Sequence, residues 1–541
     1  MVPAVSSSRR DAIGHLPIDW ARRSWVVALL VGLLFGSFFV LRYLGLWSDS
    51  DTATFVGHIE EVITSGRLDS PGSYPHGYGY PVWVATLVSM TGASVSSLQR
   101  EYLPIVGNAL LALFGFVAFN ALLKSPRLAA LSAMVLFLVP EVYFTVSRGN
   151  HEKLTVSMTL LALLTLAGSF NEFYGRRRWA VFSGWVLVFY LAAVTLGGLN
   201  VLFGSSFIVG ITITVLAASL VIGLRRRETS DLVPITRRMV LVSSTSWLFV
   251  ALVMFFIYPK AGNNLLLLDT TIERVGALAL TMTAESDPYA AVQFGWSSPL
   301  VYQFLSSFRW ILFFTSFTAW IVLMSQSWRH LRHLRVERVL LMSLYGAFGL
   351  QLAVAIPVDF LGLGAGTNLQ VRMYTYFALF SAPVFALGLS TALERWVNAR
   401  TRLVRYGVLT LTALFVVFSV AKATLDPVVS NRWLYFWESE IRALGYLDGH
   451  LERAVIWTGV DARLSNALRT ERFREWAATR NSLSFDLDSS PRTTHAVWSP
   501  VIELAAKTRG VPTPVLWREN LTYDNGEARI YHRIPRTPFQ R

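Results

Sequence analysis

Long apolar runs separated by short basic loops constrain the fold of this chain more than any other feature. A helix needs roughly 20 consecutive apolar residues to cross a hydrocarbon core of about 30 Å. The 541 residues are 53% hydrophobic and only 15% charged, which is too apolar for a soluble protein of this length. The sequence therefore predicts an all-α polytopic membrane domain with about eleven spans. The expected spans are 24–47, 102–123, 127–145, 154–170, 179–198, 200–224, 239–258, 304–327, 339–357, 373–393 and 404–422.

The segment Tyr80–Ala93 decides the topology of everything that follows it. Its apolar stretch is too short for a span and is typical of an interfacial or re-entrant helix. If it lies in the outer interface, every strongly basic loop faces the cytoplasm, as the positive-inside rule requires. If it spans, all of these loops face outward. We therefore predict an interfacial helix here. The basic loops are 124–127, 176–178, 225–238, 329–338 and 395–405.

This topology divides the chain into three parts. Residues 1–23 form a cytoplasmic N-terminus, residues 24–425 the membrane domain, and residues 426–541 an extracytoplasmic domain. The C-terminal part mixes helical patterns with strand-like runs and an Asp524-Asn525-Gly526 turn signal, which predicts a small α/β domain. The helical patterns are 433–447 and 469–478, and the strand-like runs are 454–458, 496–497 and 528–532. We expect a multi-pass protein of the plasma membrane.

Charge and cysteine content exclude several classes of function. The formal net charge is +14, but the basic residues punctuate apolar runs and form no basic face for nucleic acid. We read them as topology signals, and we expect membrane lipids and not nucleic acid as partners. The chain has no cysteine, which excludes disulfides, thiolate metal sites and cysteine nucleophiles.

Acidic, histidine and aromatic residues converge in the first external loop. Asp49 and Asp51 directly follow the first span, and the loop ends in a tyrosine- and proline-rich segment with His76 and Tyr78. Carboxylates at a membrane boundary can act as a general base or hold a divalent cation, because both uses need anionic oxygens close together. The simpler explanation is that Asp51 caps the helix that follows.

A second cluster of ionisable residues interrupts the apolar runs after the third span. It contains Glu141, Arg148, His151 and Glu152. Ionisable groups at membrane depth are costly unless they face a cavity or one another, which favours a site. The alternative is an ordinary helix-surface ion pair, because Arg148 and Glu152 are four residues apart.

The third candidate is Arg372 with Tyr374 and Tyr376, at the outer end of the tenth expected span. An arginine at a helix end commonly reaches any lipid headgroup. As a functional group it would be a fixed cation for a phosphate, and the tyrosines would pack an isoprenoid or a sugar.

This arrangement resembles the GT-C superfamily of membrane glycosyltransferases. The superfamily includes protein O-mannosyltransferases, aminoarabinose transferases and arabinosyltransferases. The resemblance rests on acidic residues after the first helix (Asp49 and Asp51), on a Tyr/His/Pro-rich start of an interfacial helix (74–81), and on the order Pro140, Arg148, Glu152. The chain departs from the pattern by having Asp-Ser-Asp where several relatives have Asp-Glu, and Tyr-Pro-His-Gly-Tyr where His-Pro-Pro is usual.

The resemblance implies an inverting transfer of a sugar from a polyprenyl-phosphate donor to a glycan, glycolipid or protein acceptor. Asp49 or Asp51 would deprotonate the acceptor hydroxyl, and Arg372 would neutralise the departing phosphate. The residues implied to hold substrate are Tyr374, Tyr376, His76, Tyr78, Arg148, His151 and Glu152. The resemblance leaves open whether Asp49, Asp51 and Glu152 hold a divalent cation such as magnesium or manganese.

Other functions fit a polytopic chain with basic cytoplasmic loops. A lipid-linked oligosaccharide flippase or transporter would be expected to carry charge deep in several spans, whereas 179–224 and 404–420 are nearly free of it. A glycan polymerase or ligase would use arginine-centred external chemistry, and external arginines are few. A non-catalytic scaffold would have an apolar external groove.

Overall fold

The computed structural model describes most of the membrane domain and parts of the C-terminal domain. The described stretches are 20–43, 50–68, 73–175, 179–224, 233–264, 299–329, 336–361, 369–397, 436–451, 493–509 and 519–533, with most of 454–464 and short pieces between them.

Long helices occupy the positions of the expected spans. Apart from 127–145, each expected span up to residue 393 coincides with a helix, and the last one, 404–422, lies mostly outside the described residues. Among the described residues, 7 helices are long and apolar enough to cross a membrane, or up to 8 if one bent pair is a single span. The helices of the bundle are α1 (Trp20–Tyr43), α5 (Leu103–Leu123), α6 (Pro126–Phe137), α7 (Pro140–Ser147), α8 (Glu152–Gly175), α9 (Trp179–Leu199), α10 (Val201–Leu224), α11 (Val233–Leu252) with the π-helical turn η5 (Val253–Ile257), α14 (Pro299–Arg329), α15 (Val336–Phe360) and α16 (Leu369–Val397).

The bent pair corrects one of the expected spans. Segment 127–145 was expected to be continuous, but α6 and α7 meet at an angle of 77°. The break lies at Val139, whose backbone is extended, directly before Pro140. Proline disfavours the helical conformation in the residue before it and cannot donate a backbone hydrogen bond. The bend carries the chain into the short segment 148–151, which becomes the centre of the site described below.

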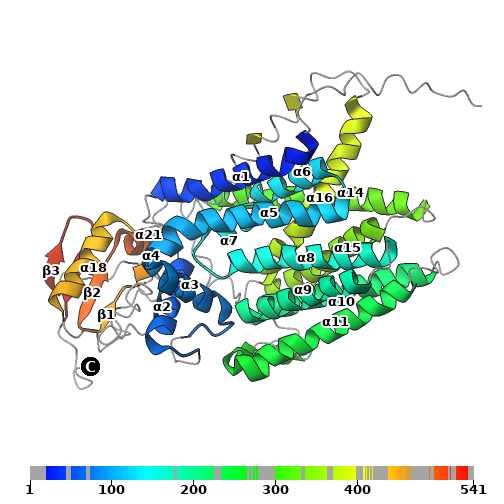
Figure 1. The fold of residues 1–541 in the computed structure, drawn as a ribbon. Coiled ribbons are helices and arrows are strands. Elements are labelled where there is room, and N and C mark those ends of the chain that lie inside the picture. The colour runs from blue at the N-terminus through cyan, green and yellow to red at the C-terminus, as the bar shows by residue number, and fades with distance from the viewer. Residues whose placement is uncertain are drawn as a thin grey trace, which may run out of the picture.

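The chain between α1 and α5 folds into short helices at one end of the bundle. They are α2 (Ser50–Ser65), α3 (Gly79–Thr91), α4 (Val95–Ser97) and the π-helical turn η3 (Leu98–Tyr102) that leads into α5. At 13 residues, α3 is too short to cross a bilayer, which agrees with the predicted interfacial helix. Figure 1 shows α2 and α3 at the same end of the bundle as the C-terminal domain.

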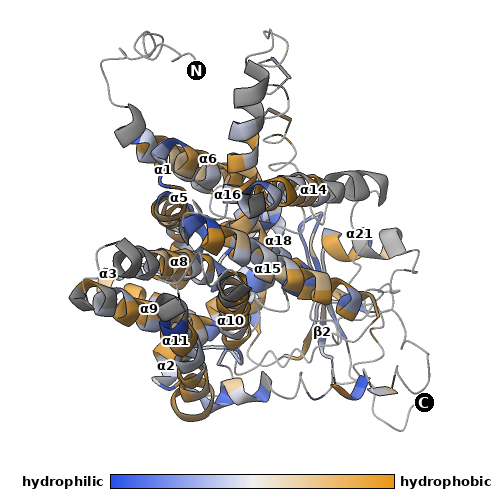
Figure 2. Cartoon of the chain, turned by 90° about the vertical axis from the view of Figure 1, so that its right-hand side faces the viewer, coloured by the Kyte–Doolittle hydropathy of each residue, from blue (hydrophilic) through white to orange (hydrophobic). Residues whose placement is uncertain are grey.

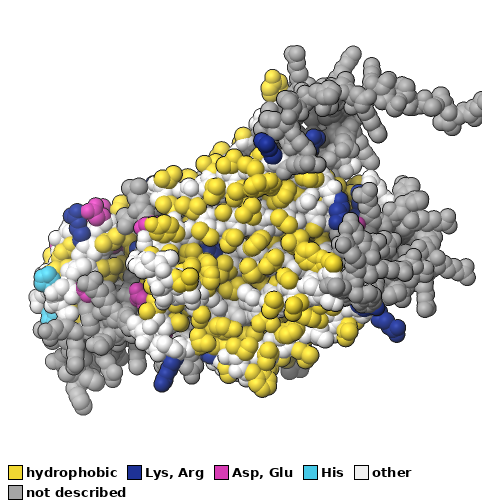
Figure 3. Space-filling view, viewed as in Figure 1, with side chains coloured by type: hydrophobic (Ala, Val, Ile, Leu, Met, Phe, Trp, Pro, Cys, Tyr) yellow, Lys and Arg dark blue, Asp and Glu magenta, His cyan; other side chains and the backbone are white. Residues whose placement is uncertain are grey.

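The long helices pack side by side, and their lipid-facing surface is apolar. Figure 2 shows most of them nearly end-on and rich in hydrophobic residues. In Figure 3, hydrophobic side chains cover the middle of the bundle, and most charged side chains lie toward its ends. Gly32 and Gly36 let α1 approach α5 closely, because a Cβ at Gly36 would lie 2.8 Å from the Cα of Ile105. Small residues at such crossings are a common basis of helix packing in membranes.

The C-terminal domain contains a four-stranded sheet with strand order β1-β2-β4-β3. Strands β1 and β2 are parallel, whereas β4 pairs antiparallel with both β2 and β3. The hairpin of β3 and β4 turns at the expected Asp524–Gly526 segment, and the predicted α/β domain is confirmed. The elements are β1 (Ile456–Trp457), β2 (His495–Trp498), β3 (Asn520–Asp524), β4 (Arg529–His532), α18 (Glu438–His450) and α21 (Pro500–Arg509), and the helix expected at 469–478 lies outside the described residues.

Direct contacts hold the C-terminal domain against the bundle. The Phe436 ring lies between the guanidinium groups of Arg100 and Arg463, at 5.4 and 5.7 Å from their central carbons. Arg100 belongs to η3, and Arg463 is fully buried in the C-terminal domain with Glu440 and Asp461, both at 2.9 Å. Val501 of α21 packs into the main cluster of buried residues of the bundle. The site at this end of the bundle therefore lies close to the C-terminal domain.

Candidate active site

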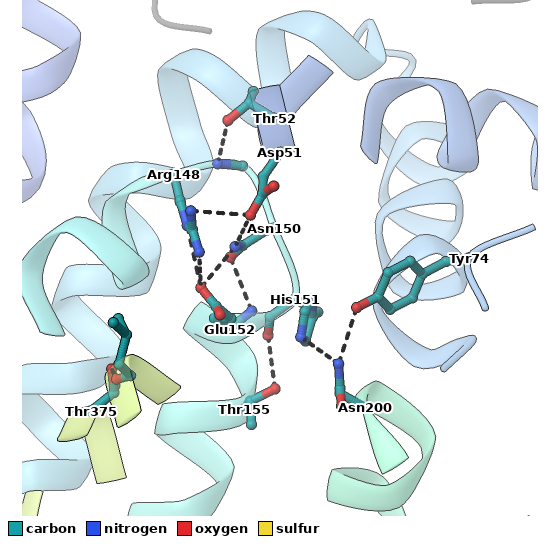
Figure 4. A network of polar contacts seen from close by, with 12 residues as sticks. Asp51, Thr52, Tyr74, Arg148, Asn150, His151, Glu152, Thr155, Asn200 and Thr375 are labelled. Atoms are coloured by element: carbon teal, nitrogen blue, oxygen red, sulfur yellow. Dashed lines mark hydrogen bonds and ion pairs between the residues drawn. The ribbon is translucent and has the colours of Figure 1, made fainter. Parts of the chain in front are cut away.

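The site begins where the N-terminus of α2 meets the 148–151 segment. The backbone amide of Gly149 donates a hydrogen bond of 2.8 Å to the hydroxyl of Thr52. A side chain is not tolerated at Gly149, because its Cβ would lie 2.7 Å from the Thr52 methyl group and 3.0 Å from Oε1 of Gln99. This contact brings Asp51, in the first turn of α2, beside Arg148 (Figure 4).

Arg148 joins two carboxylates that are far apart in sequence. Its guanidinium lies 3.1 Å from Asp51 Oδ2 and 2.6 Å from Glu152 Oε2. Asn150 supports both acids: its amide nitrogen donates to Glu152 at 2.9 Å and more weakly to Asp51 at 3.4 Å. Its side-chain oxygen accepts from the backbone amide of Glu152 at 3.0 Å, which caps α8. The side chain of Asp51 is 43% exposed and that of Glu152 12%, so Asp51 is the acid that can reach a substrate.

His151, in the same segment, belongs to a hydrogen-bonded series of neutral side chains with Asn200 and Tyr74. The Asn200 amide nitrogen is 2.9 Å from His151 Nε2 and donates to the Tyr74 hydroxyl at 3.0 Å. Asn200 Oδ1 accepts from the backbone amide of Phe203, which directs its nitrogen toward the imidazole. Nε2 of His151 therefore accepts, and its Nδ1 carries the proton. Nδ1 is buried and has no hydrogen-bond partner in the described part of the chain.

Burial lowers the pKa of His151, which lies outside the membrane-spanning helices, well below its ordinary value. Burial also raises the pKa of Tyr74. Both groups are therefore neutral near pH 7.

The buried imidazole makes stability depend on pH. The unfolded chain binds a proton at His151 below about pH 6.5, whereas the folded chain binds it only below a pKa of about 4. Stability is therefore present above this pH and falls, by up to about 1.4 kcal/mol per pH unit, as the pH drops toward the folded-state pKa. We expect His151→Gln to flatten the fall of the melting temperature between pH 7 and pH 5 in detergent. If the melting temperature of the variant fell as steeply between pH 7 and pH 5, groups other than His151 would cause the pH dependence.

Arg372 lies in the first turn of α16, where its charge acts on groups of the site. Its guanidinium lies 5.9 Å from the centre of the Phe203 ring, and its charge lowers the pKa values of both Tyr74 and His151. Asp359 accepts from the backbone amide of Gln370 at 2.6 Å and fixes the start of this helix. Within the described stretches, no carboxylate forms an ion pair with Arg372. Its charge is therefore available to an anion.

Tyr374 and Tyr376 lie in the core behind Arg372. They are 4% and 1% exposed, and the Tyr376 hydroxyl donates to the Phe203 carbonyl at 3.2 Å. Tyr376 packs against the Phe203 ring that Arg372 contacts, and Tyr374 packs against Phe377.

His76 and Tyr78 belong to the segment that covers the turn between α9 and α10. The His76 carbonyl accepts from the backbone amide of Val201 at 2.9 Å, and the His76 ring lies 5.2 Å from that of Tyr74. A Cβ at Gly77 would overlap the carbonyl of Leu199. This close contact holds Tyr74 over His151, and Tyr78 packs with Tyr258.

Asp49, the second expected acid, lies outside the described residues. Among those that are described, no group of three or more His, Asp or Glu side chains could hold a metal ion. Arg148 contacts oxygens of both Asp51 and Glu152, so a divalent cation at these acids would have to displace its guanidinium. The described side chains do not fit a metal centre, and the cation expected at Asp49, Asp51 and Glu152 stays a prediction.

Sequence reasoning did not assign a role to Thr52, Asn150 or Asn200. Asn200 leaves a weak signal, because it is a single amide between two strongly apolar runs. Thr52 and Asn150 are common types at helix starts and carry no signal of their own. Their partners lie 97 and 99 residues away in the chain, at Gly149 and Asp51.

Comparison with known proteins identifies the fold of the chain. No family model and no curated protein matches the sequence. The structure is similar to an archaeal oligosaccharyltransferase from Archaeoglobus fulgidus, tethered with an acceptor peptide containing the NVT sequon. The TM-score is 0.53 at 13% identity, over 96% of this chain and 74% of the other. The chain has the GT-C fold.

The chain is also similar to two further solved structures. The complex of the archaeal oligosaccharyltransferase with zinc and sulfate has a TM-score of 0.51 at 12% identity, over 94% and 73% of the two chains. The likeness to ArnT from Cupriavidus metallidurans bound to undecaprenyl phosphate is weaker, with a TM-score of 0.37 and 13% identity over 95% and 97%. In this GT-C fold, a polytopic helical domain is followed by a small domain containing a sheet, as the sequence predicted.

Proposed function

We propose that this protein is a membrane glycosyltransferase that moves a sugar from a polyprenyl-phosphate donor to a glycan, lipid or protein acceptor. One observation carries the proposal. At one end of a GT-C bundle, a half-exposed carboxylate, Asp51, shares a site with a cation that has no acid partner among the described residues, Arg372. Glycosyl transfer needs both a base for the acceptor and a positive charge for the leaving phosphate.

Asp51 is the proposed general base. Its contacts with Arg148 and Asn150 both use Oδ2, and no hydrogen bond to Oδ1 is present in the described part of the chain. Arg148, itself paired with Glu152, and Asn150 hold the carboxylate in place. Asp49, two residues earlier, is the alternative base.

The reaction is a single displacement. The acceptor oxygen attacks the anomeric carbon, its proton passes to the Asp51 carboxylate, and the bond from the anomeric carbon to the phosphate oxygen breaks. The electron pair of that bond leaves with the phosphate, whose added charge Arg372 neutralises. Attack opposite the leaving group inverts the configuration at the anomeric carbon. His151, held by Asn200, is proposed to help position the sugar.

The sidedness of the site follows from the loop charges. With the basic loops in the cytoplasm, the end formed by α2, α3 and the C-terminal domain faces outward. The proposed acceptor therefore lies on the extracytoplasmic face of the plasma membrane, and the N-terminus is cytoplasmic. The C-terminal domain borders this end of the bundle and is the proposed contact surface for a large acceptor (Figure 1).

The direct test is transfer by the purified protein in lipid nanodiscs. Radiolabelled polyprenyl-phosphate hexoses are supplied with glycan, glycolipid and peptide acceptors. We expect Asp51→Asn to lower kcat by about 10²–10⁴-fold, because the amide cannot take the proton. Glu438→Gln is the matched control, since Glu438 is a 74% exposed acid of the C-terminal domain.

Assays of the same purified protein distinguish glycosyl transfer from the alternative functions. Turnover that survives Asp51→Asn and Asp49→Asn, alone and together, would remove this mechanism. Lipid or ion transport in vesicles, without any glycosyl transfer, would instead support a flippase or transporter.

A further inference from the structure

Gln99, in the π-helical turn η3, lies directly against the segment 149–153 of the active site. Its side chain is fully buried, and its amide oxygen accepts a hydrogen bond from the Tyr80 hydroxyl. The same oxygen would lie 3.0 Å from a Cβ at Gly149. Gln99 therefore packs against the residue whose backbone amide donates to Thr52 and so holds the start of α2.

A buried lysine reaches the same tyrosine from the other end of this segment. Lys153 is 1% exposed, and its ammonium group donates to the Tyr80 hydroxyl at 3.3 Å and lies 5.6 Å from the centre of the Tyr80 ring. Lys153 directly follows Glu152, the acid that pairs with Arg148. The hydrogen bonds from Lys153 to Tyr80 and from Tyr80 to Gln99 therefore join α8, α3 and η3 beneath the active site.

The amide nitrogen of Gln99 indicates that this position serves more than stability. The nitrogen is buried and has no hydrogen-bond partner among the described residues. An unsatisfied buried amide is unfavourable, and an apolar side chain of the same length would avoid it. The glutamine is therefore best explained by what its oxygen fixes, which is the Tyr80 hydroxyl and the backbone of Gly149.

The next residue of the turn, Arg100, contacts the C-terminal domain. Its guanidinium lies 5.4 Å from the centre of the Phe436 ring, which also contacts the guanidinium of Arg463 at 5.7 Å. Phe436 is 3% exposed, and Arg463 is fully buried and paired with two carboxylates of the same domain. Consecutive residues of a helix do not face each other. Gln99 and Arg100 therefore join two different partners, the active site and the C-terminal domain (Figure 1).

The turn itself is held firmly at both ends. The amide of Leu103 donates to the carbonyl of Leu98, the five-residue spacing that defines a π-helix. Both leucines are buried in an apolar cluster with residues of α2, α3 and α8. Single π-helical turns occur frequently at functional sites. A displacement of this turn at Arg100 would also displace Gln99, because the two residues share one clamped turn of backbone.

We propose that Gln99 is a positioning residue through which the C-terminal domain fixes the catalytic segment 149–153. The proposal rests on the proposed function, because it takes this segment as part of the active site. Phe436 fixes Arg100, and Gln99 on the same turn fixes the backbone that holds Asp51 in place. The C-terminal domain then acts on the chemical step itself, in addition to any contact with a large acceptor, because small displacements of catalytic groups cost much of the rate.

The kinetic test uses glycerol as acceptor, because it is too small to contact the active site and the C-terminal domain at once. We expect Phe436→Ala to lower kcat by about tenfold or more and to leave the KM of the polyprenyl-phosphate sugar unchanged. Tyr446→Ala is the matched control, since Tyr446 packs with His450 and Tyr523 within the same domain. A loss in Phe436→Ala that is confined to the KM of large acceptors would overturn the proposal.

Variants of Gln99 test the connection from its other end. Gln99→Met removes the amide at nearly constant length and should lower kcat about as much as Phe436→Ala, whereas Gln99→Glu keeps an acceptor oxygen for Tyr80 and should recover part of the rate. The double variant Gln99→Met with Phe436→Ala should be no slower than the slower single variant, because both changes break the same connection. Multiplied losses in the double variant would show independent effects and overturn the proposal.

Hydrogen exchange tests the same connection without donor or acceptor. In lipid nanodiscs, Phe436→Ala and Gln99→Met should each speed amide exchange in peptides that contain 149–153, and Tyr446→Ala should not. Unchanged exchange in both variants would overturn the proposal. Faster exchange in a protein that transfers no sugar would leave the connection standing and reject the proposed function. Glycosyl transfer with unchanged kcat and unchanged exchange in the variants would do the reverse.

Discussion

Arg372→Ala lowers turnover by about 10²–10³-fold if the arginine neutralises the leaving phosphate. The expectation follows from its position, since Arg372 lies at the start of α16, beside Phe203, without a carboxylate partner in the described part of the chain. Loss of the cation removes an interaction that strengthens as the phosphate bond breaks, so kcat falls more than KM rises. Steady-state kinetics with a polyprenyl-phosphate sugar measure the effect.

Two further variants make this result specific. Arg372→Lys keeps the charge but loses the bidentate geometry, and we expect it to recover part of the activity. Arg442→Ala removes a 66% exposed arginine from the C-terminal domain and should leave kcat unchanged. If Arg372→Ala retained full turnover, the phosphate would have to be neutralised elsewhere and this role for Arg372 would be wrong.

The second prediction concerns Arg148 and the free energy of unfolding. Arg148→Met should lower the free energy of unfolding by about 3 kcal/mol, because it leaves Glu152 buried without its cation. The partner Asp51 is half exposed and contributes less, since water screens it. Denaturant titration in detergent micelles, followed by circular dichroism, measures the change.

A double variant separates the charge from the packing. Adding Glu152→Gln to Arg148→Met removes the unpaired carboxylate, so we expect it to restore more than half of the lost stability. The double variant should still be impaired in transfer, because nothing then holds Asp51. An additive loss of stability in the double variant would contradict the importance of the buried charge.

The site depends on segments that are remote in sequence. Asp51 comes from α2, Arg148 and Glu152 from the α7–α8 junction, and Arg372 from α16. Asn200, at the turn between α9 and α10, links His151 to Tyr74. Because four regions of the chain each supply a part, the geometry exists only when the whole bundle is assembled.

Much of the architecture could be predicted from local pattern. The lengths of the apolar runs predicted the long helices, and the short apolar stretch predicted α3 as a helix too short to span. The Asp-Asn-Gly turn predicted the hairpin of β3 and β4. These features depend on neighbouring residues alone, through hydrophobic burial and backbone hydrogen bonding.

The pairing of side chains could not be predicted in the same way. The sequence by itself determined a membrane bundle and a small C-terminal α/β domain, and it singled out the acids and arginines near the ends of the spans. It left open whether Arg148 belongs to a site or only pairs with Glu152, four residues away. Only the tertiary structure brought Asp51 to the same guanidinium, broke the third span at Val139 and placed Tyr374 and Tyr376 in the core. The physical reason is that helix formation is local, whereas each of these outcomes depends on which faces of distant helices meet.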